Sequence, residues 1–93
     1  MREYYVYILT NMTNTVLYTG VTNDLNRRVE QHRAGKGAKF PARYHTTKLV
    51  YYETFEYIED AILRDKQIKG GSRQKKIDLV NAVNPDWEDF FGD

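Results

Sequence analysis

Residues 4–32 of the 93-residue chain read YYVYILTNMTNTVLYTGVTNDLNRRVEQH. The first part, residues 4–9, is aromatic, apolar and β-branched, a composition that favours a β-strand. Residues 11–15 are rich in turn formers, and residues 16–21 again favour a strand. The stretch therefore predicts a β-hairpin. Gly20, near the end of the second strand, either relaxes the backbone or lets another group approach closely.

A helix is predicted to follow the hairpin directly. Thr22 or Asn23 can cap it, and Asp24 in its first turn suits the positive end of the helix dipole. Apolar residues and a histidine recur at helical spacing and form one face, with Arg28 beside it. That face consists of Leu25, Val29 and His32. The helix should end near Gly35, because glycines supply stop signals.

The rest of the chain predicts one more strand and two more helices. After an irregular basic segment, residues 49–55 favour a strand, and residues 59–69 and 73–83 favour helices, the second capped by Ser72. The order β-β-α-β-α-α indicates a single α+β domain over residues 1–93, with a small, mainly antiparallel sheet covered by helices. Three aromatic residues near the C-terminus should fold back onto the domain as a hydrophobic clasp, or alternatively dock a partner: Trp87, Phe90 and Phe91.

The composition excludes several classes of protein. The chain contains no cysteine, which rules out disulfides and thiolate metal sites. No apolar run approaches the length of a membrane span, and the N-terminal residues resemble a strand rather than a signal peptide. We therefore expect a cytoplasmic protein without membrane contact. We also expect no small-molecule cofactor, since glycine-rich phosphate loops and dinucleotide fingerprints are absent from the sequence.

The net charge of +1 conceals two basic blocks, at residues 27–48 and 64–76, each containing a single acid. An acidic stretch at residues 53–60 separates them. Such a pattern suits a face that meets a polyanion, and it is equally typical of an ordinary solvated surface. The candidate nucleic-acid contacts are Arg27, Lys36, Lys39, Arg43, Lys69 and Arg73.

Four residues of the hairpin and first helix form a candidate catalytic group: Tyr7, Tyr18, Arg28 and His32. The tyrosines can meet across an antiparallel pair, and Arg28 and His32 lie one helical turn apart. In phosphodiester hydrolysis an arginine stabilises charge on the phosphate, and a tyrosine or histidine accepts a proton from water. Departure of the alkoxide calls for a divalent metal and hence a carboxylate. Taken singly, each residue more often has a structural role, such as packing, solvation or helix capping.

These residues resemble the signature of the GIY-YIG superfamily. The first motif is matched by YVY at 5–7, with Tyr for the leading Gly, and the second by YTG at 18–20, with Thr for Ile. Tyr18 of the second motif lies eleven positions after Tyr7 of the first. Arg28 lies ten positions after Tyr18, and His32 lies one helical turn beyond Arg28. More narrowly, nearly the whole chain resembles the small stand-alone bacterial UPF0213 or YhbQ-like group. That likeness continues at residues 35–39, 49–51, 64–69, 75–77 and 84–87.

The resemblance implies a three-stranded antiparallel sheet flanked by helices. It also implies a metal-dependent endonuclease that acts on DNA, in repair or processing, through a single divalent ion, Mg²⁺ or Mn²⁺. Tyr7 and Tyr18 would be the signature tyrosines. Arg28 would hold the scissile phosphate, and His32 would assist proton transfer or positioning.

The metal ligand is where the chain departs from the family. The family's metal-binding Glu falls in a helical pattern like Arg-Glu-Lys, whereas residues 64–66 read RDK. The resemblance makes Asp65 the ligand, with a side chain one methylene shorter, and leaves Glu59 and Asp60 as weaker substitutes. One alternative is that Asp65 only pairs with Lys69 at helical spacing. Another is a nucleic-acid-binding module with weak or no catalysis.

Overall fold

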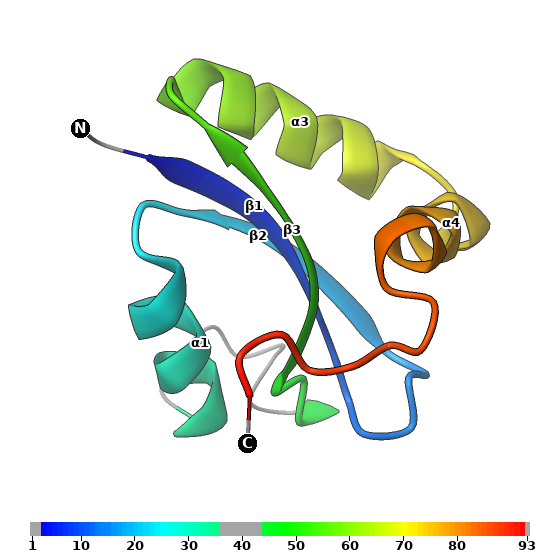
Figure 1. The fold of residues 1–93 in the computed structure, drawn as a ribbon. Coiled ribbons are helices and arrows are strands. Elements are labelled where there is room, and N and C mark those ends of the chain that lie inside the picture. The colour runs from blue at the N-terminus through cyan, green and yellow to red at the C-terminus, as the bar shows by residue number, and fades with distance from the viewer. Residues whose placement is uncertain (1–2, 36–43, 93) are drawn as a thin grey trace.

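The computed structural model describes residues 3–35 and 44–92 (Figure 1). Its elements are β1 Tyr4–Thr10, β2 Leu17–Thr22, α1 Leu25–Arg33, β3 Lys48–Phe55, α3 Ile58–Gly70 and α4 Arg73–Val83. The predicted α+β class and the order β-β-α-β-α-α are confirmed. The candidate contacts Lys36, Lys39 and Arg43 lie outside the described residues. None of the helices in the described ranges has the length and apolar character needed to cross a bilayer.

The central strand of the sheet is β1, with β2 on one side and β3 on the other, both antiparallel to it. Tyr7 lies opposite Gly20 of β2 and opposite Tyr52 of β3. The pairing with β3 shifts register after Ile8. Since side chains alternate along a strand, every second residue of β1 faces the same layer.

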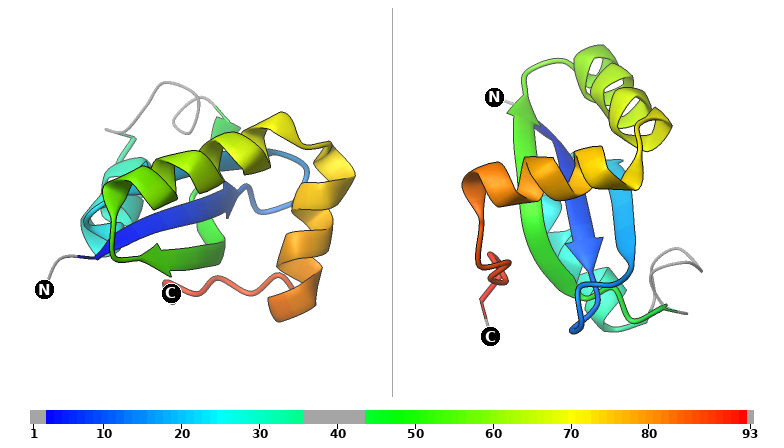
Figure 2. Two further views of the ribbon diagram at one scale, coloured as in Figure 1. Left: turned by 90° about the horizontal axis from the view of Figure 1, so that it is seen from above. Right: turned by 90° about the vertical axis from the view of Figure 1, so that its right-hand side faces the viewer.

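Different helices cover the two faces of the sheet (Figures 1 and 2). On one face α1 contributes Val29 to a small core with Tyr7, Leu9 and Leu49. On the other face α3 and α4 enclose a larger core. Its buried members are Val6, Ile8, Val50, Tyr51, Ala61, Ile68 and Val80. The central strand therefore joins both layers, and apolar burial on each side stabilises it.

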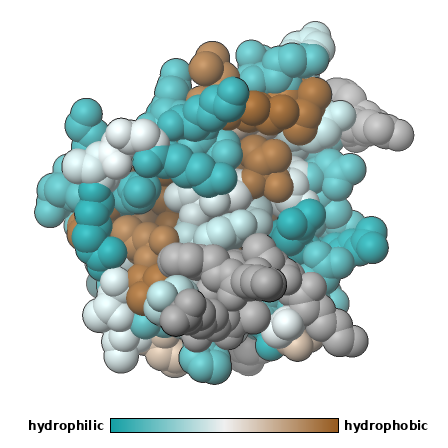
Figure 3. Space-filling model, turned by 180° about the vertical axis from the view of Figure 1, so that it is seen from behind, coloured by the Kyte–Doolittle hydropathy of each residue, from teal (hydrophilic) through white to brown (hydrophobic). Residues whose placement is uncertain are grey.

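The apolar residues of α3 do not all face the sheet. Ala61 and Ile68 are buried, whereas Ile62 and Leu63 are 42% and 57% exposed. Seen from behind, hydrophobic side chains gather at the top of the molecule, over this helix (Figure 3). The sequence pattern identifies the helix correctly but does not separate its buried apolar residues from the exposed ones.

Side-chain caps set the beginnings of two helices, and one predicted cap was wrong. Asp24, rather than Thr22 or Asn23, caps α1, with its carboxylate accepting a 3.2 Å hydrogen bond from the N–H three residues later. Thr22 instead accepts a 3.1 Å hydrogen bond from the N–H of Asp24 through its hydroxyl. All three residue types are good caps, so composition could not distinguish them. Ser72 caps α4 as predicted.

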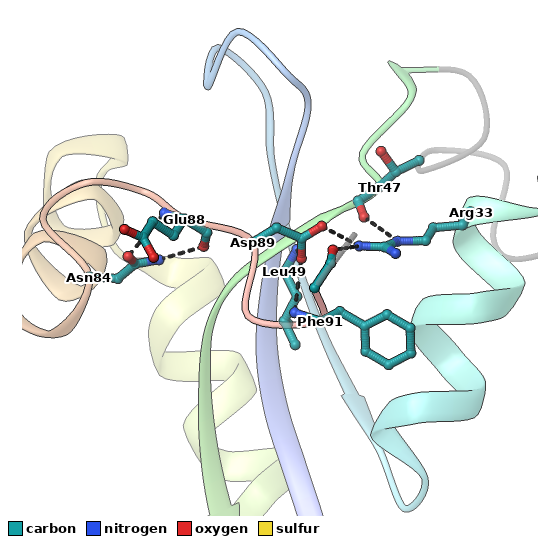
Figure 4. A network of polar contacts seen from close by, with 8 residues as sticks. Arg33, Thr47, Leu49, Asn84, Glu88, Asp89 and Phe91 are labelled. Carbon is teal, nitrogen blue, oxygen red and sulfur yellow. Dashed lines mark hydrogen bonds and ion pairs between the residues drawn. The ribbon is translucent and has the colours of Figure 1, made fainter.

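The C-terminal segment returns along β3 and is fixed to α1 by polar contacts (Figure 4). Arg33 donates through Nε to the backbone oxygen of Thr47 at 3.0 Å and forms an ion pair with Asp89. The Asp89 carboxylate also accepts the N–H of Leu49 at 3.1 Å. Asn84 is buried and donates to the backbone oxygen of Val50 at 3.0 Å. Arg33, which belongs to the first basic block, is therefore engaged in holding the tail.

The predicted aromatic clasp is confirmed in part. Trp87 packs against the core beneath α3 and α4, and Phe91 packs against the core beneath α1. The N–H of Phe90 donates to the backbone oxygen of Leu49 at 2.7 Å, but its side chain is 45% exposed. The tail thus partly buries two of its aromatic rings and exposes more of the third to solvent.

Candidate active site

Tyr7 is positioned by β1 and by a glycine on the neighbouring strand. Its ring lies over Gly20, where an added Cβ would come within 2.5 Å of the Tyr7 hydroxyl oxygen and 2.7 Å of the ring. Glycine is needed here for close approach, the second of the two roles expected for it. Tyr7 is only 1% exposed, so its hydroxyl is held in a fixed interior position.

Tyr18 and His32 bring two more rings to the same place. Tyr18 lies opposite Leu9 and is therefore diagonal to Tyr7, with ring centroids 6.3 Å apart. The ring of His32, from the last turn of α1, lies 6.0 Å from that of Tyr7 and 5.7 Å from that of Tyr18. The hairpin register and the helix thus bring together three residues that the sequence spacing had grouped.

The Tyr7 hydroxyl and His32 Nε2 form a buried hydrogen bond of 3.2 Å. Burial raises the pKa of Tyr7, and neighbouring Tyr18 raises it further. Burial lowers the pKa of His32, as does the positive charge of Arg28. At neutral pH the phenol is therefore protonated and the imidazole neutral. His32 Nδ1 is also buried and has no hydrogen-bond partner within the described ranges.

Arg28 supplies a fixed positive charge beside this pair. Its charge and its hydrogen bond lower the pKa of Tyr7, although burial remains the larger effect. Arg28 is half-buried and also lines a surface cavity of about 170 Å³. The other lining residues are Thr22, Asn23, Asp24, Arg27 and Gln31. Arg28 thus lies between the buried rings and a recess on the surface.

Asp65 reaches the same region from α3, on the other side of the sheet. Its negative charge contributes to the raised pKa of Tyr7. Its Oδ2 lies 3.0 Å from Lys69 Nζ, so the simple helical pair exists. Its Oδ1 is buried and has no hydrogen-bond partner in the described part of the chain. The side chain is 15% exposed, and a buried carboxylate oxygen without a partner is unusual.

The donor set suits a hard divalent ion bound through one protein carboxylate. The described residues contain no group of three or more His, Asp or Glu side chains that could hold an ion by themselves. Mg²⁺ commonly retains waters and is held by one or two carboxylates together with substrate phosphates. The unpartnered Oδ1 of Asp65 fits that pattern. Glu59 and Asp60 lie in the first turn of α3 with exposed side chains.

The other predicted nucleic-acid contacts have different surroundings. Arg27 is exposed and shares the cavity of Arg28. Lys69 is engaged with Asp65, and Arg73 donates to the backbone oxygen of Thr15 at 2.6 Å. Among these residues, Arg27 is therefore the one placed directly beside the candidate phosphate-binding residue.

Comparisons with known proteins identify the family of the chain. The model of the GIY-YIG catalytic domain matches residues 3–78, a range that contains the five candidate site residues. The chain belongs to the GIY-YIG family. Proteins that contain a GIY-YIG domain are generally nucleases.

Its relatives lie in the narrower group that the sequence resembles. UPF0213 proteins of Staphylococcus aureus strains Mu3 and Mu50 are each 40% identical over 80 residues, which cover 86% of this chain and 96% of theirs. The solution NMR structure of the UPF0213 protein BH0048 from Bacillus halodurans is 34% identical, with a TM-score of 0.57. That match covers 94% of this chain and 92% of the other. The names of these family members state no activity.

Two residues near the site were missed by sequence reasoning. Gln31 lines the Arg28 cavity, and its position three residues after Arg28 on a helix was an available signal. Tyr52 lies opposite Tyr7 in the sheet. The strand register that places it there could not be derived from residues 49–55 alone, because a shift of one residue exchanges the two faces.

Proposed function

We propose that the chain is a metal-dependent DNA endonuclease. The observation that carries the proposal is the buried hydrogen bond between Tyr7 and His32, on which Arg28 and Asp65 also act electrostatically. A neutral imidazole, a protonated phenol, a fixed cation and a partly unpaired carboxylate form a set that phosphodiester hydrolysis can use. Membership of the GIY-YIG family supports the same reaction class.

In this proposal Tyr7 and His32 relay one proton. As water attacks the phosphorus, its proton passes to the Tyr7 hydroxyl oxygen while the phenolic proton passes to His32 Nε2, and the phosphorus–oxygen bond to the leaving group breaks. The phenolate is disfavoured because burial raises the pKa of Tyr7, so the two transfers occur together. The lowered pKa of His32 keeps its ring neutral at rest, so a ring nitrogen has a lone pair available for the proton.

Arg28 is proposed to hold the scissile phosphate from its recess on the surface. A guanidinium donates two parallel hydrogen bonds to phosphate oxygens and stabilises the charge that grows on them. Arg27 would contact a neighbouring phosphate. A divalent ion on Asp65, either Mg²⁺ or Mn²⁺, would supply Lewis-acid stabilisation of the phosphate and the leaving oxygen.

The test is cleavage of plasmid, single-stranded and branched DNA with and without Mg²⁺ or Mn²⁺. Arg28→Ala and Asp65→Ala should abolish metal-dependent cleavage, whereas Lys66→Ala, at an exposed position of the same helix as Asp65, should retain it. Cleavage that persists in both site variants would identify a contaminating nuclease and end the proposal.

A second candidate function is nucleic-acid binding without turnover. The observation that favours it is the ion pair between Asp65 and Lys69, which partly neutralises a carboxylate already shorter than the family's Glu. Under this reading DNA binds with a steep salt dependence and remains intact when Mg²⁺ or Mn²⁺ is supplied. A mobility shift without product at any metal concentration would favour it over the endonuclease.

A further inference from the structure

Three aromatic rings form a cluster on the sheet face that carries Tyr7. Tyr5 of β1 and Tyr52 of β3 lie edge to face with ring centroids 6.3 Å apart. Tyr52 and Phe90 of the C-terminal segment are nearly perpendicular, with centroids 6.2 Å apart. Tyr52 is 46% exposed and Phe90 45% exposed, so both rings are available to a ligand.

Contacts of the tail with β3 and α1 hold Phe90 at this position. The Asp89 carboxylate binds the N–H of Leu49 and forms the ion pair with Arg33, and the N–H of Phe90 binds the backbone oxygen of Leu49. The Asp89 carboxylate also accepts the N–H of Phe91 at 3.0 Å (Figure 4), so the residues before and after Phe90 are both anchored. An exposed aromatic ring on an anchored backbone loses little further freedom when it binds a ligand.

A recess of about 320 Å³ lies against the cluster. Leu25, Leu49 and Phe91 contribute apolar groups to its lining, and Asn23 and Asn26 contribute amides. A recess that combines aromatic rings with amide groups suits a planar, uncharged heterocycle with hydrogen-bonding edges. The one charged residue among its described lining, Asp24, already uses its carboxylate to cap α1.

This recess neighbours the cavity of Arg28. Asn23 and Asp24 line both, so the two hollows adjoin at the beginning of α1. Phosphate-binding cations therefore lie on one side of that junction and aromatic rings on the other. A nucleic-acid strand presents the same two features, charged phosphates and apolar base faces, in close succession along its length.

We propose that Tyr5, Tyr52 and Phe90 form a stacking subsite for an unpaired nucleobase of the strand whose phosphate lies at Arg28. The inference rests on the proposed function and adds to it a substrate requirement, an unpaired nucleotide next to the phosphate that is cleaved. A base held in a duplex cannot enter the recess, because both of its faces are already stacked. The subsite positions the strand and takes no part in the chemistry.

The experiment measures binding of a short fluorescein-labelled oligothymidylate to the full chain by anisotropy, in metal-free buffer so that the DNA stays intact. Tyr52→Ala and Phe90→Ala should each weaken binding roughly tenfold, within the range for loss of one base–aromatic stack. Tyr52→Trp should retain affinity within about twofold. Tyr57→Ala, at a 63% exposed tyrosine that begins α3, is the matched control and should have no effect.

The salt dependence separates stacking from charge. The slope of log affinity against log salt should be unchanged in Tyr52→Ala and reduced in Arg27→Ala. As a second readout that needs no variant, a 2-aminopurine placed along the oligonucleotide should be quenched at one position by the wild-type protein. Unchanged affinity in Tyr52→Ala and Phe90→Ala, together with weakened binding in Arg28→Ala, would overturn the subsite and leave the proposed function standing. Failure of the wild-type protein to bind any DNA at low salt would overturn both.

Discussion

The carboxylate of Glu53, which is bound by Arg64 of α3, and the carboxylate of Asp65, in α3 itself, differ sharply in their bonding. Glu53 of β3 accepts hydrogen bonds from Arg64 Nε at 3.0 Å and Nη2 at 2.9 Å, and another from the Tyr51 hydroxyl. Asp65, the next residue of the helix, pairs through one oxygen with Lys69 and leaves the other buried and unpartnered within the described ranges. Successive residues of a helix point about 100° apart, so the two sites lie on different sides of α3.

The difference separates a structural ion pair from a candidate reactive group. Burial would raise the pKa of Glu53, but hydrogen bonds from Arg64 and Tyr51 outweigh it and leave that pKa below its usual value. Both oxygens of this carboxylate accept hydrogen bonds from protein donors. Asp65 acts instead on the buried phenol of Tyr7, and one of its oxygens has no donor among the residues that the structure describes. In the sequence both residues count as one negative charge. In the structure their partners distinguish them, Glu53 as part of an ion pair with Arg64 and Asp65 as a candidate metal ligand.

Replacing each acid in turn should give the largest contrast in activity. We expect Asp65→Ala to lower the rate of metal-dependent DNA cleavage about 100-fold or more, the usual effect of removing one group that stabilises transition-state charge. Glu53→Gln keeps the shape of the side chain that contacts Arg64 and Tyr51, and should change that rate less than about threefold. Initial rates of plasmid cleavage at saturating Mg²⁺ measure both. Equal losses in the two variants would remove the distinction between the sites.

Stability should show the reverse order. Glu53→Ala leaves Arg64 and the Tyr51 hydroxyl without their acceptor and should lower the free energy of unfolding by about 2 kcal/mol, a value reduced from that of a fully buried pair because both partners are partly exposed. Asp65→Ala should change the free energy of unfolding by less than about 1 kcal/mol, since its one partner is an exposed lysine. Urea denaturation followed by circular dichroism tests both values. A larger loss for Asp65→Ala would show that this residue is structural.

Lys69 should compete with a divalent ion for Asp65. Removing it in Lys69→Ala should strengthen Mn²⁺ binding roughly threefold, because an exposed ion pair contributes only a few tenths to 1 kcal/mol. Isothermal titration calorimetry measures the Mn²⁺ affinity of the wild type and of Lys69→Ala. Asp65→Ala, which is expected to lack the metal ligand, provides the baseline. Lys66→Ala removes the same charge from an exposed neighbouring position and is the control. Weaker binding in Lys69→Ala than in this control would contradict the competition.

The smallest effect concerns pH. The pKa of His32 in the folded chain lies below its unfolded value of about 6.5, because burial and Arg28 disfavour the charged ring. The unfolded chain therefore binds more protons in the window below pH 6.5, and the contribution of His32 to stability is present above it and lost as pH falls through the folded pKa. The free energy of unfolding should decline less over this window in His32→Gln than in the wild type. Parallel curves for the two proteins would contradict the shift.

Local signals in the sequence were sufficient to predict the helices and strands, but not to predict which side chains contact one another. The aromatic and β-branched composition of residues 4–9 and the spacing of Leu25, Val29 and His32 predicted β1 and α1, and one of the two roles expected for Gly20 was the close approach that Tyr7 makes. Capping residues are interchangeable in composition, so Asp24 was placed one position inside the helix it caps.

Long-range contacts explain what could not be predicted. Arg64 of α3 belongs to a basic block by sequence, yet it is bound to Glu53 of β3. Arg33 likewise holds Asp89, a residue far along the chain. The aromatic partner Phe90 reaches Tyr52 only because the tail returns along β3. Such pairs depend on register and on the path of the tail, which residue types alone do not specify.

The central claim is that the Tyr7 hydroxyl, paired with His32 beside Arg28 and Asp65, takes part in phosphodiester cleavage. Tyr7→Phe removes that one oxygen and keeps the ring that packs over Gly20. The decisive measurement is the rate of Mg²⁺-dependent DNA cleavage by this variant, alongside its unfolding transition. We predict a loss of about 100-fold or more with the fold retained. A Tyr7→Phe protein that folds and cleaves DNA at the wild-type rate would contradict the claim.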